Sequence, residues 1–264
     1  MRHLYLLVLV SSLLWGCIPS HPRTGMQVAS KPRPVSQEPV PRVKESAQVK
    51  TIEYEGFTVS FNSQLHIPIW VSYELTAEET KGPYSRDGKD YQQDPYTLVS
   101  QADASDYRRS GWSRGHMAPA ADFKWSDTAM TQTFYYTNIC PQDIQLNNNY
   151  WGTLEKHVRG WAKQFGKVYV VTGPVLGDRV RRIGSHGVAV PDAFFKAILA
   201  QNGDDWTSIG FIMLNTPDPK LLKDCAITVN EVEKLTGLDF FDFLDNSIEE
   251  TVENTLDYKT WRVY

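Results

Sequence analysis

Cysteine is scarce in this sequence: the 264 residues contain three, at positions 17, 140 and 225. None stands in a CxxC pair or in a cysteine–histidine cluster with zinc spacing, which excludes the zinc-finger class of protein. Long hydrophobic runs are also scarce. The one example, Leu4 to Trp15, is shorter than the about 20 residues that a transmembrane helix needs. The chain is otherwise 41% hydrophobic and 12% aromatic, which is enough for a sizeable core.

The apolar run has the flanks of an export signal. Two basic residues precede it, and it ends in the tetrapeptide LWGC at residues 14–17. A basic start, an apolar segment and small residues at a cleavage point are typical of a secretory signal. The tetrapeptide resembles the lipobox of bacterial lipoproteins, in which the cysteine is lipidated and becomes the new N-terminus. We expect residues 1–17 to be a lipoprotein-type signal peptide with Cys17 lipidated; plain cleavage is the alternative.

This interpretation predicts an exported protein of the bacterial cell envelope. A lipid on Cys17 would anchor it to a membrane, facing the periplasm or the exterior. Residues 18–50 contain six prolines and almost no large apolar residues, so we expect a semi-extended, basic, Pro-rich tether. The three predicted parts of the chain are therefore a signal peptide, this tether, and one domain over residues 51–264.

Positive charge is in short supply in the predicted domain. Residues 51–264 carry 20 lysines and arginines against 29 aspartates and glutamates, a formal charge of −9. A nucleic-acid binder that works through a broad basic face is therefore disfavoured, and any anion site must be local. The two basic clusters, at 108–109 and 179–186, either follow a nucleic-acid backbone or form solvated loops.

Apolar patterns within the domain predict both strands and helices. Strands are expected at 56–60, 68–75, 167–176, 192–200 and 205–214. Helices are expected at 128–136, 147–165 and 226–237, and residues 76–110 are expected to be mostly long loops. Because these elements do not alternate regularly, we predict an α+β domain rather than a doubly wound sheet.

Two cysteines remain to be placed if Cys17 carries a lipid. An oxidising compartment would permit one disulfide between Cys140 and Cys225. Two buried free thiols are the alternative, and the sequence does not decide between them.

The segment GWSRGHMAPAADF, residues 111–123, contains the first candidate site. It places Arg114 and His116 two positions apart, outside any helical pattern. Histidine is the side chain that changes charge near neutral pH. The pair indicates either a base and a cation that converge on one small anion, or a polar turn.

A second candidate lies on the predicted helix 147–165. On a regular α-helix Asn147 and Glu155 lie about 80° apart, within one broad face. An amide oxygen and a carboxylate so placed could hold a hydrated Mg²⁺, because this ion keeps several waters and takes few protein ligands. The alternative is that Asn147 caps the helix and Glu155 faces solvent.

These two segments carry a family resemblance. SRGHMAPAADF is similar to the D-R-G-H-x-A-P motif of the DNA/RNA non-specific endonucleases, and TNICPQDIQLNNNYWGTLE is similar to their second motif, N-x-x-P-Q-x-x-x-L-N-x-x-x-W-x-x-L-E. The similarity extends over nearly all of residues 57–264. It implies a ββα-metal (His-Me finger) nuclease fold with a central mixed or antiparallel sheet flanked by helices.

The resemblance also implies roles for three residues. His116 matches the general base, which would take a proton from water. Asn147 matches the one protein ligand of Mg²⁺, with Mn²⁺ or another divalent ion as alternatives. Glu155 matches a carboxylate that holds metal-bound water.

Three further positions match the family. Arg114 matches the motif arginine, whose guanidinium can contact phosphate oxygens. Arg86 matches a further phosphate-binding arginine, with an ordinary surface arginine as the alternative. Asn138 begins the second motif and is expected to position the site. The motif departs at Ser113, where Asp is usual; the form with serine resembles that of exonuclease-like mitochondrial relatives of endonuclease G.

The resemblance implies a metal-dependent, sequence-non-specific nuclease with DNA and RNA as substrates. The alternative is a non-catalytic, nucleic-acid-binding surface lipoprotein that keeps the nuclease fold. The resemblance leaves a homodimer open, identifies no inhibitor protein, and does not fix the balance of endonuclease and exonuclease activity.

Overall fold

The structure, a computed structural model, describes residues 40–41 and 46–263, which belong to one compact unit. The predicted signal peptide, the lipidated Cys17 and most of the predicted tether lie outside the described residues. Among those described, none of the helices has the length and apolar character needed to cross a membrane. The predicted tether extends two residues into the first strand, which begins at Val49.

The centre of the unit is a seven-stranded sheet in which every neighbouring pair is antiparallel. This is the α+β architecture that the sequence predicts. In spatial order the strands are β1 (Val49–Glu53), β2 (Thr58–Asn62), β3 (Ile67–Thr76), β6 (Lys167–Val175), β9 (Ala193–Asn202), β10 (Asp205–Leu214) and β11 (Ala226–Ile227). Two short antiparallel pairs lie outside this sheet: β4 (Ser113–His116) with β5 (Ile139–Gln142), and β7 (Arg181–Ile183) with β8 (Val188–Val190).

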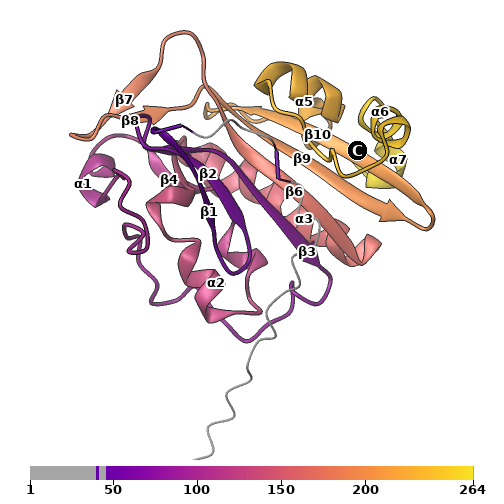
Figure 1. Ribbon diagram of the computed structural model, residues 1–264, viewed down its shortest axis with the longest axis horizontal. Helices are drawn as coiled ribbons and strands as arrows, with labels where there is room; N and C mark the ends of the chain where they lie inside the picture. Colours follow the sequence, from indigo (N-terminus) through magenta and orange to yellow (C-terminus); the bar gives the residue numbers. More distant parts are fainter. Residues whose placement is uncertain (1–39, 42–45, 264) are drawn as a thin grey trace, which may run out of the picture. The chain divides into compact units, whose positions relative to one another are not determined.

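Helices cover both faces of the sheet. The longest, α3 (Gly152–Phe165), packs against β3, β6 and β9, whereas α5 (Val229–Thr236) and α6 (Asn246–Glu253) pack against β10 (Figure 1). The shorter helices are α1 (Ala104–Tyr107), η1 (Ala120–Asp122), α2 (Asp127–Gln132), η2 (Tyr136–Asn138), α4 (Leu222–Cys225) and α7 (Tyr258–Trp261).

Strand β9 shows why the sheet needs two helical layers. Successive side chains of a strand point to opposite faces. Phe194 and Ile198 belong to the core that includes α3, while Phe195 and Leu199 belong to a second core with α5. All four are fully buried, which explains the nearly continuous apolar run in this segment.

The predicted helix 147–165 is not a regular α-helix. Its first turn, η3 (Leu146–Trp151), is a π-helix that continues into α3. A π-turn holds one more residue than an α-turn, so the expected angle of about 80° between Asn147 and Glu155 does not apply. The expected apolar face is correct over α3, where Leu154, Val158 and Trp161 are buried.

Cys140 and Cys225 are free, buried thiols, which is the second of the two alternatives left open by the sequence. Burial raises the pKa of both thiols above their ordinary value. Neither is therefore a thiolate at neutral pH.

A buried carboxyl group on α6 gives a testable stability effect. Glu253 is 5% exposed and its Oε1 has no hydrogen-bond partner among the described residues. Burial, and then the neighbouring Glu233 and Glu249, raise its pKa from 4.5 to about 9. A group that binds its proton more tightly in the folded state loses stability as pH rises from the unfolded to the folded pKa.

We therefore expect Glu253→Gln to stabilise the protein by about 1–2 kcal/mol near pH 8 and to be neutral near pH 4. Urea denaturation at both pH values measures the difference. Exposed Glu250, changed to Gln, is the matched control. A gain of equal size at both pH values would show that the effect is unrelated to ionisation.

Candidate active site

Two short strands and the π-turn bring the two sequence motifs together. β4 pairs with β5 so that Ser113 lies opposite Gln142 and His116 opposite Ile139. The chain then passes directly from β5 into η3 and α3, which completes a ββα unit. Gly115 is required at this pairing because a Cβ there would clash with the Gln142 side chain. The pairing of β4 with β5 therefore fixes the position of His116, the last residue of β4.

His116 lies at the end of β4 between two aromatic rings. Its ring centre is 5.3 Å from that of Tyr91 and 5.0 Å from that of Phe134. The residue is 8% exposed, and its Nε2 has no hydrogen-bond partner among the described residues. Burial, and then the charges of Arg86 and Arg114, lower its pKa from 6.5 to about 3. The imidazole is therefore neutral and available as a proton acceptor at ordinary pH.

Two arginines lie on the rings that surround this histidine. The guanidinium carbon of Arg114 is 4.1 Å from the centre of the Tyr91 ring, and the Tyr91 hydroxyl donates to the Arg114 carbonyl at 3.2 Å. The guanidinium carbon of Arg86 is 5.4 Å from the centre of the Phe134 ring. The sequence separates Arg86 from the histidine by thirty positions, and the structure brings them to one place.

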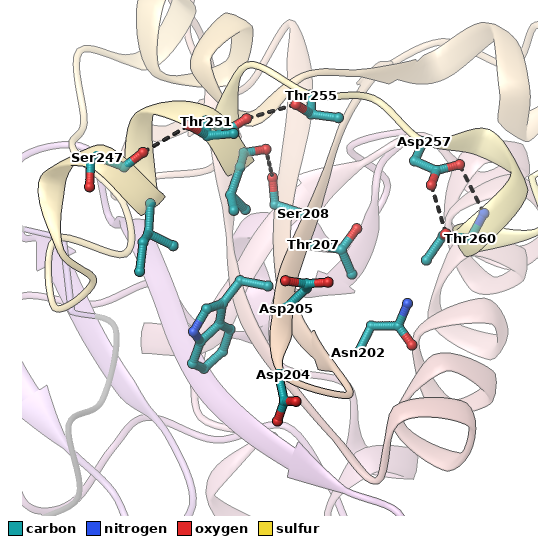
Figure 2. A pocket seen from close by; sticks show the side chains of 13 residues that line it. Asn202, Asp204, Asp205, Thr207, Ser208, Ser247, Thr251, Thr255, Asp257 and Thr260 are labelled. Atoms are coloured by element: carbon teal, nitrogen blue, oxygen red, sulfur yellow. Dashed lines mark hydrogen bonds between the residues drawn. The ribbon is translucent and has the colours of Figure 1, made fainter.

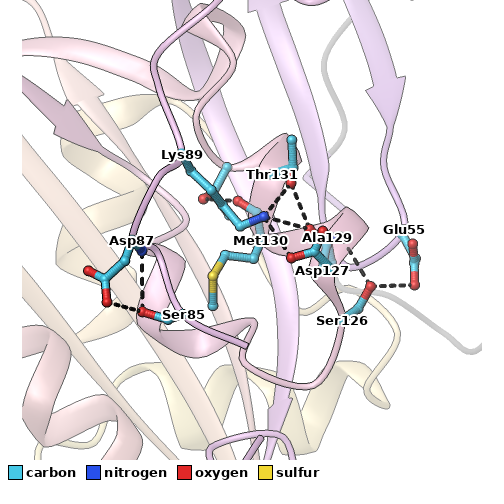
Figure 3. A network of polar contacts seen from close by, with 10 residues as sticks. Glu55, Ser85, Asp87, Lys89, Ser126, Asp127, Ala129, Met130 and Thr131 are labelled. Atoms are coloured by element: carbon cyan, nitrogen blue, oxygen red, sulfur yellow. Dashed lines mark hydrogen bonds and ion pairs between the residues drawn. The ribbon is translucent and has the colours of Figure 1, made fainter. Parts of the chain in front are cut away.

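The loop that carries Arg86 is tied to α2 rather than free. The Lys89 ammonium contacts Asp127 Oδ1 at 2.7 Å and donates to Thr131 Oγ1 at 2.8 Å (Figure 3). The Lys89 backbone N–H donates to the Arg86 carbonyl at 3.1 Å, which closes the turn. Further along, the Gln92 N–H donates to the Phe134 carbonyl. These contacts hold the predicted long loop against the elements that flank the histidine.

Asn147 lies on the π-turn and is oriented by the motif serine. Its Nδ2 donates to Ser113 Oγ at 3.1 Å, and Ser113 Oγ donates to the Gln142 carbonyl at 2.7 Å. Because the serine hydroxyl uses its one proton on that carbonyl, it can only accept from Asn147. The amide NH₂ must therefore face Ser113, and none of the described residues donates a hydrogen bond to Oδ1. The Asn147 oxygen is left available for a ligand.

Glu155 belongs to a group of charged residues that are buried or half-buried. Burial raises its pKa from 4.5 to about 7, against the opposing effect of Lys196. Lys196, on β9, is fully buried, with its ammonium 4.7 Å from the centre of the Trp151 ring and no hydrogen-bond partner among the described residues. Asp122 pairs with Arg159 at 2.7 Å in the same group. Charges from three elements therefore determine the ionisation of Glu155.

Asn138 is fully buried and does not reach the solvent side of the site. Its Oδ1 accepts from the Ala118 N–H, and its Nδ2 donates to the Ala118 and Thr133 carbonyls, all at 2.8–2.9 Å. The Met117 N–H donates to the Asn138 carbonyl at 3.0 Å. Asn138 thus fixes the backbone of Met117 and Ala118, the two residues that follow His116.

Within the described residues, one group of three side chains has the composition of a metal site, and it is not at Asn147. It consists of Asp103, Asp106 and His186. The buried Asp106 carboxylate accepts from the His186 N–H, from His186 Nδ1 and from the Asp103 N–H at 2.9–3.0 Å. Both oxygens of the Asp106 carboxylate therefore accept hydrogen bonds. The bonds from His186 hold the turn between β7 and β8 against α1 (Figure 1).

A cavity of about 520 Å³ between β10, α6 and α7 shares no lining residue with the site. Several of its polar side chains hydrogen-bond to the backbone: Thr251 donates to the Ser247 carbonyl within α6, and Ser208 of β10 donates to the Val252 carbonyl of α6 (Figure 2). None of the residues that line this cavity is a histidine or an arginine.

Residues 39–247 match the DNA/RNA non-specific endonuclease family, over well more than half of the chain. The chain belongs to this family. Nuclease C1 of Cunninghamella echinulata var. echinulata is 37% identical over 212 residues, which are 74% of this chain and 84% of that protein. Human mitochondrial endonuclease G is 32% identical over 208 residues, 74% of this chain and 69% of that protein.

Other relatives are longer than the matched region. Human mitochondrial nuclease EXOG is 34% identical over 212 residues, which are 74% of this chain but 57% of that protein. A solved structure, the crystal structure of the EndoG/EndoGI complex, superposes with a TM-score of 0.69 at 30% identity, covering 75% of this chain and 88% of that chain. The chain is accordingly a sequence-non-specific nuclease of α+β fold, from a family of divalent-metal-dependent enzymes.

The sequence did not single out several residues that build the site of this nuclease. Tyr91 and Phe134 enclose the histidine, but aromatic residues in a loop and after a short helix carry no distinctive local pattern. Lys196 lies in a strand segment of otherwise mostly apolar residues. A lone lysine in such a segment is unusual, and this is the one signal in the sequence that could have identified it. The bond between Ser113 and Asn147 joins two motifs, so neither motif alone reveals it.

Proposed function

We propose that this nuclease hydrolyses phosphodiester bonds of DNA and RNA with His116 as the general base. The observation that carries the proposal is the buried, neutral imidazole, set between two rings that each hold an arginine, with an Nε2 that bonds to none of the described residues. A neutral imidazole can take a proton from water as that water attacks phosphorus. Low base specificity follows, because histidine and arginine address water and phosphate, which carry no sequence information.

The two arginines would contact the phosphate. Arg114 and Arg86 present planar guanidinium groups that can bind phosphate oxygens through two parallel hydrogen bonds. Charge on those oxygens grows as water attacks, so the arginines would stabilise the transition state more than the ground state. Burial lowers the pKa of His116, and the charges of the two arginines lower it further, which keeps the base unprotonated. The same two side chains therefore serve both the substrate and the base.

The Asn147 amide fits a divalent ion. Its Oδ1 faces away from Ser113 and has no donor in the part of the chain that the structure describes, and an amide oxygen is a ligand that Mg²⁺ accepts. We propose Mg²⁺, with Mn²⁺ as a substitute, and Glu155 as the carboxylate that orients water around the ion. When bound, the ion would neutralise phosphate charge and assist departure of the leaving oxygen. Ser113 replaces the usual aspartate while still fixing the amide.

Metal removal tests the proposal. The purified protein, mixed with supercoiled plasmid and separately with RNA, is expected to cleave both in Mg²⁺ and neither after EDTA treatment. Adding back Mg²⁺ should restore cleavage, because the charge neutralisation assigned to the ion is worth several kcal/mol. Cleavage that is equal with and without chelator would overturn the metal assignment. Binding of nucleic acid without cleavage in any divalent ion would favour the non-catalytic alternative.

The ionisation of the site predicts an unusual pH dependence. A base acts when deprotonated, so activity falls as pH drops through its pKa. His116, with a pKa of about 3, should impose no loss down to about pH 5, whereas Glu155, with a pKa of about 7, should impose a loss near neutrality. We expect kcat/KM of the wild type to decline below about pH 7. Glu155→Gln should be slower but free of that decline; if it keeps the same decline, His116 is the titrating group.

We also propose that the protein is exported and held at the cell envelope by a lipid on Cys17. The support is the LWGC tetrapeptide and the preceding apolar run. Labelled palmitate should be incorporated by the wild type and lost in Cys17→Ser. Incorporation that persists in the variant would place the lipid elsewhere.

A further inference from the structure

A pocket of about 470 Å³ opens directly beside the proposed metal ligand. Its walls come from α1, from the residues just before β4, from β4 itself and from the π-turn; they include Tyr107, Arg108, Trp112, Ser113, Arg114 and Asn147. The volume lies within the range of about 300–1,000 Å³ typical of small-ligand pockets. Arg114 and Asn147 belong both to this pocket and to the reactive centre. A substrate held at the centre therefore has this pocket as its immediate neighbour.

We propose that the pocket binds one unpaired nucleotide adjacent to the scissile phosphate, with Trp112 as the stacking surface and Arg108 as the contact for the next phosphate. The inference rests on the proposed nuclease function and makes single-stranded or frayed nucleic acid the preferred substrate. An aromatic surface combined with cationic side chains is the usual means of binding single strands without base preference.

The indole of Trp112 is held in place before any ligand arrives. The guanidinium carbon of Arg181 lies 5.1 Å from the centre of the indole ring, a cation–π contact. Arg181 belongs to β7, and His186 in the turn after β7 is latched to the buried Asp106 of α1. A surface that is already oriented loses less side-chain entropy when a base stacks on it. The β7–β8 hairpin, a basic loop in the sequence, thus supports the pocket.

The polar groups of the pocket suit a nucleotide. Both charged residues among those that line it are arginines, Arg108 and Arg114. The nearby carboxylates of Asp103 and Asp106 accept hydrogen bonds within the α1 cap and from His186, which keeps them engaged.

The pocket would accept an unpaired base and not a paired one. In a duplex the faces of each base are covered by its neighbours, and exposing one requires unstacking. A single strand or a frayed end presents its base faces at lower cost, and stacking on an aromatic ring then adds affinity. The local arginines also explain how a domain with a formal charge of −9 attracts a polyanion: the cations are concentrated beside the reactive centre.

Binding by Trp112 variants tests the inference. In a His116→Ala background, the affinity for a labelled single-stranded oligothymidylate of about 12 nucleotides is compared with that for a duplex of the same length. Trp112→Ala should weaken single-strand binding by about tenfold or more and duplex binding by less than about twofold, the scale of one stacked base. Trp112→Phe should restore most of the affinity. Tyr96→Ala, an exposed aromatic outside the pocket, should change neither.

A second variant covers the case in which Trp112→Ala does not fold. Arg108→Gln should weaken single-strand binding and reduce the slope of log affinity against log salt by about 0.7, the value of one phosphate contact on a single strand. Lys163→Ala, on the exposed side of α3, is the charge control. Unchanged single-strand affinity in both Trp112→Ala and Arg108→Gln, or equal losses on single strand and duplex, would overturn the inference.

Failure of the inference and failure of the proposed function give different results. Hydrolysis of bis(p-nitrophenyl) phosphate offers a phosphodiester without a nucleobase, so it reports the chemistry alone. If His116→Ala hydrolyses this ester as fast as the wild type, the proposed function is wrong whatever the binding data show. If His116→Ala is inactive but Trp112→Ala binds the single strand normally, the function stands and the nucleotide pocket is wrong.

Discussion

Replacing His116 by alanine is expected to lower kcat/KM on plasmid DNA and on RNA by about 10²–10⁴-fold, the usual contribution of a general base. The imidazole is the one described group that is neutral, unpartnered at Nε2 and placed beside both Arg86 and Arg114. Alanine removes the proton acceptor but leaves both arginines and Asn147 in place. Substrate affinity should therefore change much less than kcat.

His157→Ala is the matched control for this experiment. His157 lies on α3, with its ring centre 5.6 Å from that of Trp161, outside the set of side chains around His116. Its removal should leave kcat within about twofold, as for a substitution away from special features. A loss of less than about fivefold in His116→Ala, or a comparable loss in His157→Ala, would contradict the assignment of the base. Thermal melts of both variants should confirm that the fold is retained.

The second large effect is expected from Asn147→Ala. This variant removes the amide oxygen assigned to the divalent ion, whose charge stabilisation is worth several kcal/mol, so kcat/KM should fall by about 10²–10⁴-fold. The Mg²⁺ concentration that gives half-maximal activity should rise. Because Asn147 is partly exposed, the fold should survive the change. Isothermal titration with Mg²⁺ measures the loss of binding separately from activity.

Two companion variants sharpen this prediction. Asn148→Ala, an exposed neighbour in the same π-turn, should have no effect on activity or on Mg²⁺ binding. Ser113→Ala keeps the Asn147 oxygen but removes the hydrogen bond that orients it, so a loss of about tenfold is expected, the value of one hydrogen bond of about 1.4 kcal/mol. If Ser113→Ala is as inactive as Asn147→Ala, the serine has a larger role than orientation. If Asn147→Ala retains wild-type activity, the ion is held elsewhere.

The long apolar segments could be predicted from the sequence because the periodicity of their own apolar residues indicates the element, whichever elements they pack against. Segments such as 192–200 and 205–214 are strands at nearly the expected positions, β9 and β10. The helix closed by Gly237 is also present as α5. In each case burial on one or both faces dictates the pattern of apolar residues, so the pattern reports the structure.

The elements that build the site were harder to predict. β4 and β5 are four residues each, contain glycine and proline, and exist because each pairs with the other across the chain. The π-turn depends on the bond from Asn147 to Ser113 and on the burial of Trp151, both of which are tertiary contacts. The place of Arg86 depends on Lys89 and α2. The resemblance to the family identified Arg86 and Asn147 as site residues, whereas the local sequence pattern did not.

The π-turn has a consequence for how this segment can vary. Asn147, Asn148 and Asn149 form a run in which the second and third side chains are exposed, so their identities are weakly constrained. The length of the π-turn, by contrast, is constrained. Loss of one residue would convert the wide turn to an α-turn and rotate either Asn147 away from Ser113 or Trp151 out of the core, by about 100°. Relatives of this enzyme should therefore tolerate substitutions at the positions of Asn148 and Asn149, but not insertions or deletions within the turn.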